Sequence, residues 1–294
     1  MSDLKVYLRH QQRRVDAALR NSMPRESVRP ATIHKAMRYP VFAGGKRLRP
    51  ILVLAAAEAC GGDSDAALPA ACAVELVHTY SLVHDDLPCM DDDDLRRGRP
   101  TTHKVFGDAI AVLAGDALLT ESFAILAQMK PCSRYQAQHY ITELAQAGDS
   151  RRLIGGQVLD LEGEGKKLTK RDLIRIHEAK TAALLTCSVR LGGMAANATP
   201  HKLQALTDFG YNLGLAFQVI DDILDVTQST EKLGKTAGKD AAVDKATYPA
   251  ILGLEKSRKE AKRLTTKALG ALKPFRKQAL HLEEIAHYLL DREY

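Results

Sequence analysis

The chain has 294 residues, of which 45% are hydrophobic, 27% charged and 5% aromatic, and its formal net charge is +6. It is long enough to bury a large core, and its alanine- and leucine-rich composition favours helices over sheet. Acidic residues gather at Asp91–Asp94 and Asp221–Asp225. Because no aromatic residues are interleaved with the basic ones, this pattern argues against nucleic-acid binding and favours an anionic ligand held through a metal.

Cysteine usage and the chain's apolar stretches bear on the cellular compartment. The five cysteines are far apart and include no CxxC pair, so we expect neither a zinc site nor a disulfide framework. The N-terminal segment lacks the apolar core of a signal peptide. No apolar run approaches the roughly 18 residues that span a bilayer. We therefore expect a cytoplasmic protein without stable membrane association.

Helical periodicity recurs along the whole chain, and the breaks fall at glycine and proline. The expected helices span 3–20, 32–38, 48–60, 66–85, 107–129, 134–148, 150–162, 170–190, 201–226, 246–270 and 276–291. Segments such as 71–84 and 110–119 are apolar almost all round, which is typical of helices enclosed by others. We predict an all-α fold: one domain over 1–294, with about ten or more helices around a central substrate cavity.

An acidic cluster occupies the expected helix 201–226. Gln218, Asp221, Asp222 and Asp225 stand at i, i+3, i+4 and i+7, so all four share one face. Like charges spaced in this way repel each other unless a cation joins them, and carboxylate oxygens suit Mg²⁺. The alternative, a solvated acidic face, fits poorly with the apolar residues around the cluster.

A second cluster comprises Asp85, Asp86 and the run 91–94. In an unbroken helix Asp85 and Asp91 would lie about 120° apart. Pro88 cannot continue a helix, so we expect the chain to end its helix there and bring Asp91 back beside Asp85.

Basic residues of the kind that bind diphosphate lie near these clusters in the sequence. Lys46 and Arg49 follow a glycine pair, and Arg96-Arg97 follows the aspartates directly. A P-loop is excluded, because neither its sequence pattern nor a preceding strand is present.

These motifs, in this order, resemble the trans-isoprenyl diphosphate synthases, most closely the bacterial farnesyl diphosphate synthases. The shared segments are GGKRLRP (44–50), HDDLPCMDDDDLRRGRPTTH (84–103), GGQVLDL (155–161), FQVIDDILD (217–225) and GKTAGKDAAVDKATYP (234–249). The resemblance implies condensation of isopentenyl diphosphate with dimethylallyl and geranyl diphosphate to give farnesyl diphosphate. Magnesium-assisted ionisation, condensation and proton loss to the departing diphosphate are the implied steps.

The resemblance also assigns roles to individual residues. Three Mg²⁺ ions, with Mn²⁺ as the alternative metal, are implied at Asp85, Asp86, Asp91, Asp221, Asp222 and Asp225. Isopentenyl diphosphate binding is assigned to Lys46, Arg49, His78 and Arg97. Allylic diphosphate binding is assigned to Arg96, Lys180, Lys235 and Lys245, and contact with the reacting carbons to Thr181 and Gln218. Catalysis is assigned to Asp85, Asp91, Asp221, Lys180, Thr181 and Gln218, with Gln157 and Asp160 close by. A homodimer is implied in the same way, and the role of 292–294 is left open.

Product length depends on the residues just before the first aspartates. Tyr80 and Ser81 lie about one helical turn before Asp85, and a bulky ring there would close the floor of a pocket for the growing tail. We therefore predict a fifteen-carbon product. The alternative is that Tyr80 is an ordinary aromatic residue of the core.

Three other functions remain as alternatives. The first is a geranylgeranyl diphosphate synthase and the second a non-catalytic helical subunit. The third is a di-iron protein, suggested by the Glu-x-x-His pairs Glu75/His78 and Glu284/His287.

Overall fold

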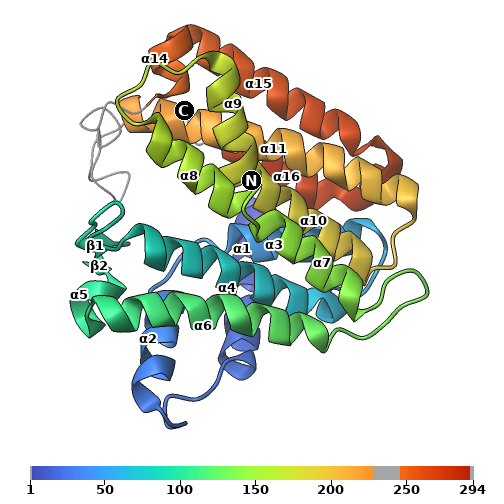
Figure 1. Cartoon of the computed structure of the whole chain (residues 1–294). Helices are drawn as coiled ribbons and strands as arrows, with labels where there is room; N and C mark the ends of the chain where they lie inside the picture. Colours follow the sequence, from blue (N-terminus) through green and yellow to red (C-terminus); the bar gives the residue numbers. More distant parts are fainter. Residues whose placement is uncertain (1, 228–245, 292–294) are drawn as a thin grey trace.

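A computed structural model describes residues 2–227 and 246–291, and it confirms the all-α fold (Figure 1). In chain order the elements are α1 (Ser2–Ser22), α2 (Ala31–Val41), α3 (Leu48–Ala59), η1 (Ser64–Ala67), α4 (Leu68–Asp85), β1 (Leu95–Arg96), β2 (Arg99–Pro100), α5 (Thr102–Phe106), α6 (Asp108–Ala127), α7 (Ala137–Gly148), α8 (Leu153–Gly163), α9 (Lys170–His177), η2 (Glu178–Ala182), α10 (Ala183–Ala195), α11 (Pro200–Thr227), α14 (Tyr248–Leu252), α15 (Leu254–Ala271), η3 (Lys273–Ala279) and α16 (Leu280–Asp291).

The centre of the bundle is built from helices that are apolar on nearly every face. Most residues of α3 and α4 are buried, as their sequences predict. Helix α4 packs against α3, α6 and α10, and α11 packs against α10 and α15. Helices α4 and α11 run toward the same end of the bundle, where the β1–β2 hairpin lies (Figure 1). The two aspartate clusters therefore arrive at one end of the molecule.

Two expected helices are modified in ways that affect the site. The segment 170–190 is continuous, but η2 forms a π-helical turn between α9 and α10. Turns of this kind change the direction of side chains and are frequent at functional sites. The expected helix 246–270 is broken at Gly253, whose φ of 80° favours glycine, and so divides into α14 and α15.

A short β-hairpin was not expected from the sequence. Strands β1 and β2 pair antiparallel, with Arg96 opposite Arg99. The two loop residues, Arg97 and Gly98, both have positive φ (54° and 71°), as a tight two-residue hairpin loop requires. The hairpin fixes where the adjacent Arg96 and Arg97 point.

Two helical stretches, Ser64–Asp85 and α6, are long and apolar enough to cross a membrane by length and composition alone. The expectation that no run approaches this length is therefore wrong. The most apolar windows of the two stretches are 67% and 39% buried inside the bundle. The core helices of soluble proteins pass the same test, and most residues of α4 are buried.

Candidate active site

The first aspartate cluster begins where α4 ends. Asp85 is the last residue of α4, and the backbone N–H of Asp91 donates to the Asp85 carbonyl oxygen at 2.8 Å. The expected return of Asp91 to Asp85 after the break at Pro88 is thus confirmed. The chain places the two carboxylate-bearing residues side by side without a continuous helix.

The environment of Asp85 disfavours its negative charge. Burial raises the pKa of Asp85 to about 6, Lys180 opposes the shift, and the neighbouring Asp91 adds to it. A carboxyl group in this position is stabilised as the anion when a cation joins it. The contribution of Lys180, which lies on η2, also places the first cluster within electrostatic reach of that π-helical turn.

Asp86 is held differently from Asp85. It is 3% exposed, and Arg96 donates to both of its carboxylate oxygens, from Nε at 2.7 and 2.9 Å and from Nη2 at 2.5 Å. Arg96 also lies 3.7 Å from Asp93. The structure thus shows Asp86, predicted as a metal ligand, in a bidentate ion pair that anchors the hairpin to the end of α4.

A compact cationic group forms beside α4. Arg49 Nη1 lies 3.2 Å from His78 Nε2, and Arg97 donates to the Gly44 carbonyl oxygen. Burial lowers the pKa of His78 well below its usual value, and Arg49 and Arg97 lower it further, so the ring stays neutral. Arg49 Nε is buried with no hydrogen-bond partner among the described residues. This group is suited to an incoming anion.

The glycine pair before Lys46 makes room for Arg97. Gly44 and Gly45 have φ values of 101° and 129°, and a Cβ on Gly45 would lie 2.6 Å from Arg97 Nη1. Any other residue at 45 would displace the guanidinium. The exposed Lys46 follows directly, so two of the predicted isopentenyl diphosphate ligands, Lys46 and Arg97, depend on this turn.

Arg47 has a role that the sequence reasoning missed. Its side chain is 2% exposed and binds Glu75 at 2.7 Å and Asp16 at 2.8 Å. It therefore ties α1, α3 and α4 together and leaves Lys46 and Arg49 to point elsewhere. The basic run 46–49 gave no signal of which cation would turn inward.

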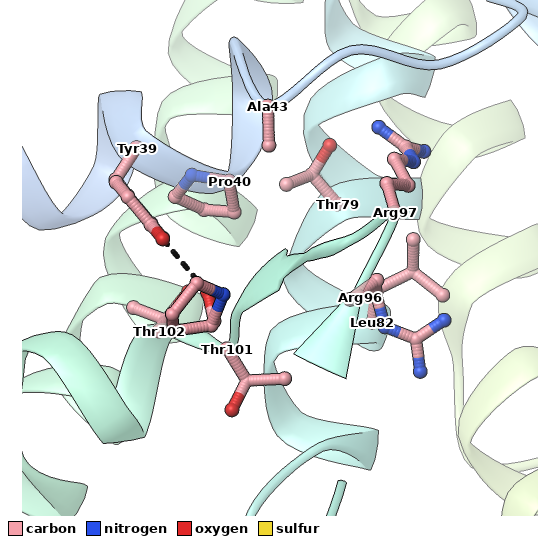
Figure 2. Close-up of a pocket in the computed structure, with 10 residues that line it drawn as sticks. Tyr39, Pro40, Ala43, Thr79, Leu82, Arg96, Arg97, Thr101 and Thr102 are labelled. Atoms are coloured by element: carbon pink, nitrogen blue, oxygen red, sulfur yellow. Dashed lines mark hydrogen bonds between the residues drawn. The ribbon is translucent and has the colours of Figure 1, made fainter. Parts of the chain in front are cut away.

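A small pocket lies between α2, α4 and the hairpin (Figure 2). Its lining residues include Tyr39, Thr79, Leu82, Arg96 and Arg97. Figure 2 shows the Arg96 and Arg97 side chains leaving the hairpin in different directions. Arg96 turns to Asp86 and Arg97 to the glycine pair, so adjacent residues serve two different places.

On the other side of the site, α8 positions Lys180. Asp160 accepts a hydrogen bond from Lys180 Nζ at 2.6 Å. Gly156, one turn earlier on α8, faces the backbone of η2, and a Cβ there would lie 2.3 Å from the Lys180 nitrogen. Close helix contact and the ion pair together fix the ammonium group. Asp160 was expected near the site, and the structure shows how it acts on Lys180.

Thr181 and Gln218 form a chain of hydrogen bonds with the second cluster. Thr181 Oγ1 donates to Gln218 Oε1 at 2.9 Å, and Gln218 Nε2 donates to Asp222 Oδ1 at 3.0 Å. The other oxygen of Asp222 accepts from the Tyr248 N–H at 2.9 Å. His177 Nε2 lies 3.8 Å from the same oxygen, Asp222 Oδ2. Asp222 is 4% exposed and thus joins α11 to the start of α14.

The two clusters converge on one site. Burial lowers the pKa of Arg49, while Glu75 and Asp221 raise it, so Asp221 acts on the cationic group beside α4. Lys180 likewise acts across the site, because its positive charge lowers the pKa of Asp85. Asp221 is the least buried aspartate of its cluster, whereas Asp225 is 6% exposed. Predicted residues from α3, α4, the hairpin, η2 and α11 thus meet at one end of the bundle.

The two residues predicted to limit product length lie one turn before Asp85 on α4, and other predicted residues are not described. Tyr80 is 6% exposed in the core, with its ring against that of His84 at 5.6 Å between centroids, and Ser81 Oγ donates to the His78 carbonyl at 2.9 Å. Lys235, Lys245 and residues 292–294 lie outside the described residues.

The donor set fits magnesium with phosphate oxygens rather than a closed protein cage. Within 2–227 and 246–291 no group of three or more His, Cys, Asp or Glu side chains could hold a metal ion. Mg²⁺ usually takes only one or two carboxylates and completes its shell with water and substrate phosphates. The Glu-x-x-His pairs do not form a di-iron site, because Glu75 is bound to Arg47 and His287 is exposed.

Comparison with known proteins decides the family. The sequence pattern of the polyprenyl synthetases matches residues 30–287. The chain belongs to the polyprenyl synthetase family. It is 47% identical over 298 residues to the heterodimeric geranylgeranyl pyrophosphate synthase large subunit 1, chloroplastic, of Arabidopsis thaliana, covering 99% of this chain and 80% of the relative.

Two further relatives extend the comparison. The chloroplastic geranylgeranyl pyrophosphate synthase of Catharanthus roseus is 48% identical over 297 residues, covering 99% of this chain and 82% of the relative. The apo crystal structure of an FPP/GFPP synthase from Zymomonas mobilis is 36% identical and superposes with a TM-score of 0.87, over 98% of this chain and 99% of the other. The likeness therefore covers the fold as well as the motifs.

Proposed function

We propose that this polyprenyl synthetase is a prenyltransferase that elongates an allylic diphosphate with isopentenyl diphosphate. The observation that carries the proposal is the convergence of Asp85 and Asp221 with Lys180 and the Arg49–His78 pair at one end of the bundle. Carboxylates and cations in one site suit a diphosphate bound partly through metal and partly through ammonium and guanidinium groups. A non-catalytic subunit would not need both the carboxylates and the cations in one site.

The residues would divide the two substrates between them. The cationic group of Lys46, Arg49 and Arg97, with the neutral His78 ring, would bind isopentenyl diphosphate. Lys180, fixed by Asp160, would bind the allylic diphosphate beside Asp85. Together they hold the double bond of one substrate against the reacting carbon of the other.

Charge that develops during ionisation would be stabilised from fixed positions. Asp85, Asp91 and Asp221 would hold Mg²⁺, which supplies Lewis-acid stabilisation of the leaving diphosphate. Thr181 Oγ1 and Gln218 Oε1 would face the allylic cation, since their hydrogen bond orients both. The proton lost from the condensed product would go to the departing diphosphate. Apolar helices around the site exclude the water that would trap the cation.

The product proposed first is geranylgeranyl diphosphate. Both plant relatives above carry that name, which favours twenty carbons over the fifteen predicted from the sequence. Farnesyl diphosphate is the second candidate, because Tyr80 is a buried aromatic residue close to Asp85. Burial raises the pKa of Tyr80 to about 12, and the nearby Asp85 carboxylate adds to the rise. The name FPP/GFPP synthase of the Zymomonas relative covers a fifteen-carbon product.

Chromatography of the products distinguishes these candidates. The enzyme is incubated with Mg²⁺, isopentenyl diphosphate and, in turn, dimethylallyl, geranyl and farnesyl diphosphate. A geranylgeranyl synthase converts all three starters to one twenty-carbon product, whereas a farnesyl synthase stops at fifteen and leaves farnesyl diphosphate unused. No elongation with any starter, under conditions where the folded protein binds diphosphate, would contradict the proposed activity.

We also propose a homodimer and a cytoplasmic location. A homodimer is supported by apolar side chains left exposed on two helices: Val112 and Leu113 on α6, and Ile154, Val158 and Leu159 on α8. Light scattering on the purified chain tests the homodimer.

A cytoplasmic location is supported by the five free cysteines, which suit a reducing compartment. The chloroplastic names of the plant relatives describe those proteins.

A further inference from the structure

A second hollow in the surface lies outside the site described above. It has a volume of about 340 Å³ and is formed by the end of α1, by α2, by strand β2 and by α5. Cations line it from three separate segments: Arg20, Lys35, Arg38 and Arg99. The acidic residue among the lining side chains is Glu26. We call it the Arg20–Arg99 pocket.

Within the described residues, three of the four cations of this pocket have no ion-pair partner, and the fourth, Arg38, has a distant one. Arg38 Nε approaches Glu26 at 3.9 Å, a distance too long for a hydrogen bond. The side chains of Arg20, Lys35 and Arg99 have no hydrogen bond or ion pair in 2–227 or 246–291. Four cations around one hollow repel one another, and an anion that entered it would relieve that repulsion.

The pocket also has a fixed aromatic wall. The guanidinium groups of Arg20 and Arg38 lie over the Phe42 ring, at 4.6 and 5.0 Å from its centroid. Arg38 reaches the carbonyl oxygens of Pro24 and Met23 at 3.3 and 3.4 Å. These contacts hold two of the cations in place before any ligand arrives, which lowers the entropy cost of binding.

The composition of the lining determines how an anion would be held. The substrate site combines aspartates with cations, as metal-mediated binding requires. The Arg20–Arg99 pocket has one carboxylate and four cations, so a phosphate group would be bound directly. Its volume is that of a small-molecule site, and larger than one phosphate needs.

We propose that the Arg20–Arg99 pocket is a metal-independent binding site for a diphosphate-bearing anion, separate from the substrate site. The ligand's source is either inorganic diphosphate or an organic diphosphate whose apolar part packs against Phe42 and Phe106. The pocket borders the substrate-binding hairpin: Arg99 pairs with Arg96 across the strands, and the Tyr39 hydroxyl, which lines both pockets, donates to the Pro100 carbonyl at 2.8 Å (Figure 2).

Calorimetric titration with inorganic diphosphate in excess EDTA tests the proposal. Two classes of site are expected in the wild type, because the Arg49–His78 group also binds anions without metal. Lys35→Ala should weaken only one class, by about tenfold or more, since it removes a charge-assisted contact. Lys46→Ala should weaken only the other class. Lys259→Ala, at an exposed lysine on α15, is the matched control and should change neither.

Three further measurements make the outcome decisive. Lys35→Glu should abolish the affected class, while turnover in the absence of added diphosphate stays at the wild-type level. Geranyl diphosphate in EDTA should bind the Lys35-dependent class more tightly than inorganic diphosphate only if the ligand is organic. Sedimentation with phosphatidic acid vesicles tests a lipid surface instead. Equal effects of Lys35→Ala and Lys259→Ala on diphosphate binding, or binding of vesicles without binding of soluble diphosphate, overturns the proposal. Because Lys35 takes no part in the proposed reaction, failure of that reaction would leave this result unchanged.

Discussion

Replacing Asp160 with asparagine should impair the allylic substrate selectively. The Asp160 and Lys180 side chains are 10% and 27% exposed and are joined at 2.6 Å, so the ion pair is largely shielded from solvent. Asparagine keeps the size of the side chain and one acceptor oxygen but loses the charge. The Lys180 ammonium would then be held less firmly and would be drawn toward Asp85.

The magnitude follows from the type of bond. A hydrogen bond to a charged group contributes roughly 1.5–3 kcal/mol, and the exposed part of Lys180 favours the lower end. We expect kcat/KM for the allylic diphosphate to fall by about tenfold to thirtyfold. The KM for isopentenyl diphosphate should stay within about twofold, because its proposed ligands lie on α3, α4 and the hairpin.

Steady-state kinetics with each substrate varied in turn provide the measurement. Asp149→Asn is the matched control, because Asp149 also pairs with a cation, the exposed Arg151, at 2.5 Å. Thermal unfolding separates a positioning effect from a loss of fold. The reasoning is refuted if Asp160→Asn behaves like Asp149→Asn, or if both substrates are affected equally in a variant that unfolds at the wild-type temperature.

Four further predictions concern the other parts of the site. Asp221→Ala should cut turnover by orders of magnitude yet keep or raise the thermal stability without substrate, because it relieves like-charge repulsion on α11; near-wild-type turnover would contradict a metal role. Arg97→Ala should mainly raise the KM for isopentenyl diphosphate and Arg96→Ala that for the allylic substrate, each by about one to two decades, and equal effects would refute the division. Burial keeps the folded-state pKa of His78 low, so below about pH 6.5 the unfolded state binds a proton that the folded state does not. The free energy of unfolding should therefore decrease as the pH is lowered below about 6.5, and less steeply in His78→Asn; unfolding measured at several pH values tests this. Tyr80→Ala should lengthen the product if that ring is the floor, and unchanged chromatograms would place the floor elsewhere.

Periodicity predicted the main helices because core helices must repeat their apolar residues regularly. It could not predict the π-helical turn at 178–182, since the sequence there remains compatible with an ordinary helix. That turn is set by packing: Gly156 on α8 comes so close to Lys180 that only glycine fits. Likewise the hairpin depends on Arg97 adopting a positive φ, which its residue type does not favour.

The sequence indicated which polar residues could gather at one end of the bundle, but not which of them the protein itself would bind. Arg47 and Arg49 are equivalent as sequence, yet one is buried against Glu75 and the other faces His78. The inward turn of Arg47 follows from its φ of 51° at the start of α3, and this conformation is not encoded by charge. Three-dimensional packing decides which of two neighbouring cations meets a ligand.

The same division appears within both aspartate motifs. Each begins with two adjacent aspartates, and in each the second is the more buried and accepts hydrogen bonds from the protein: Asp86 from Arg96, and Asp222 from Gln218 and the Tyr248 N–H. An adjacent pair on a helix points about 100° apart, so one carboxylate can face the site only if the other turns toward the scaffold. The buried member needs its donors, because an unpaired carboxylate there would be costly. Two adjacent aspartates therefore let one carboxylate face the site while the other binds a neighbouring element. Asp86 holds the hairpin in this way, and Asp222 holds the start of α14.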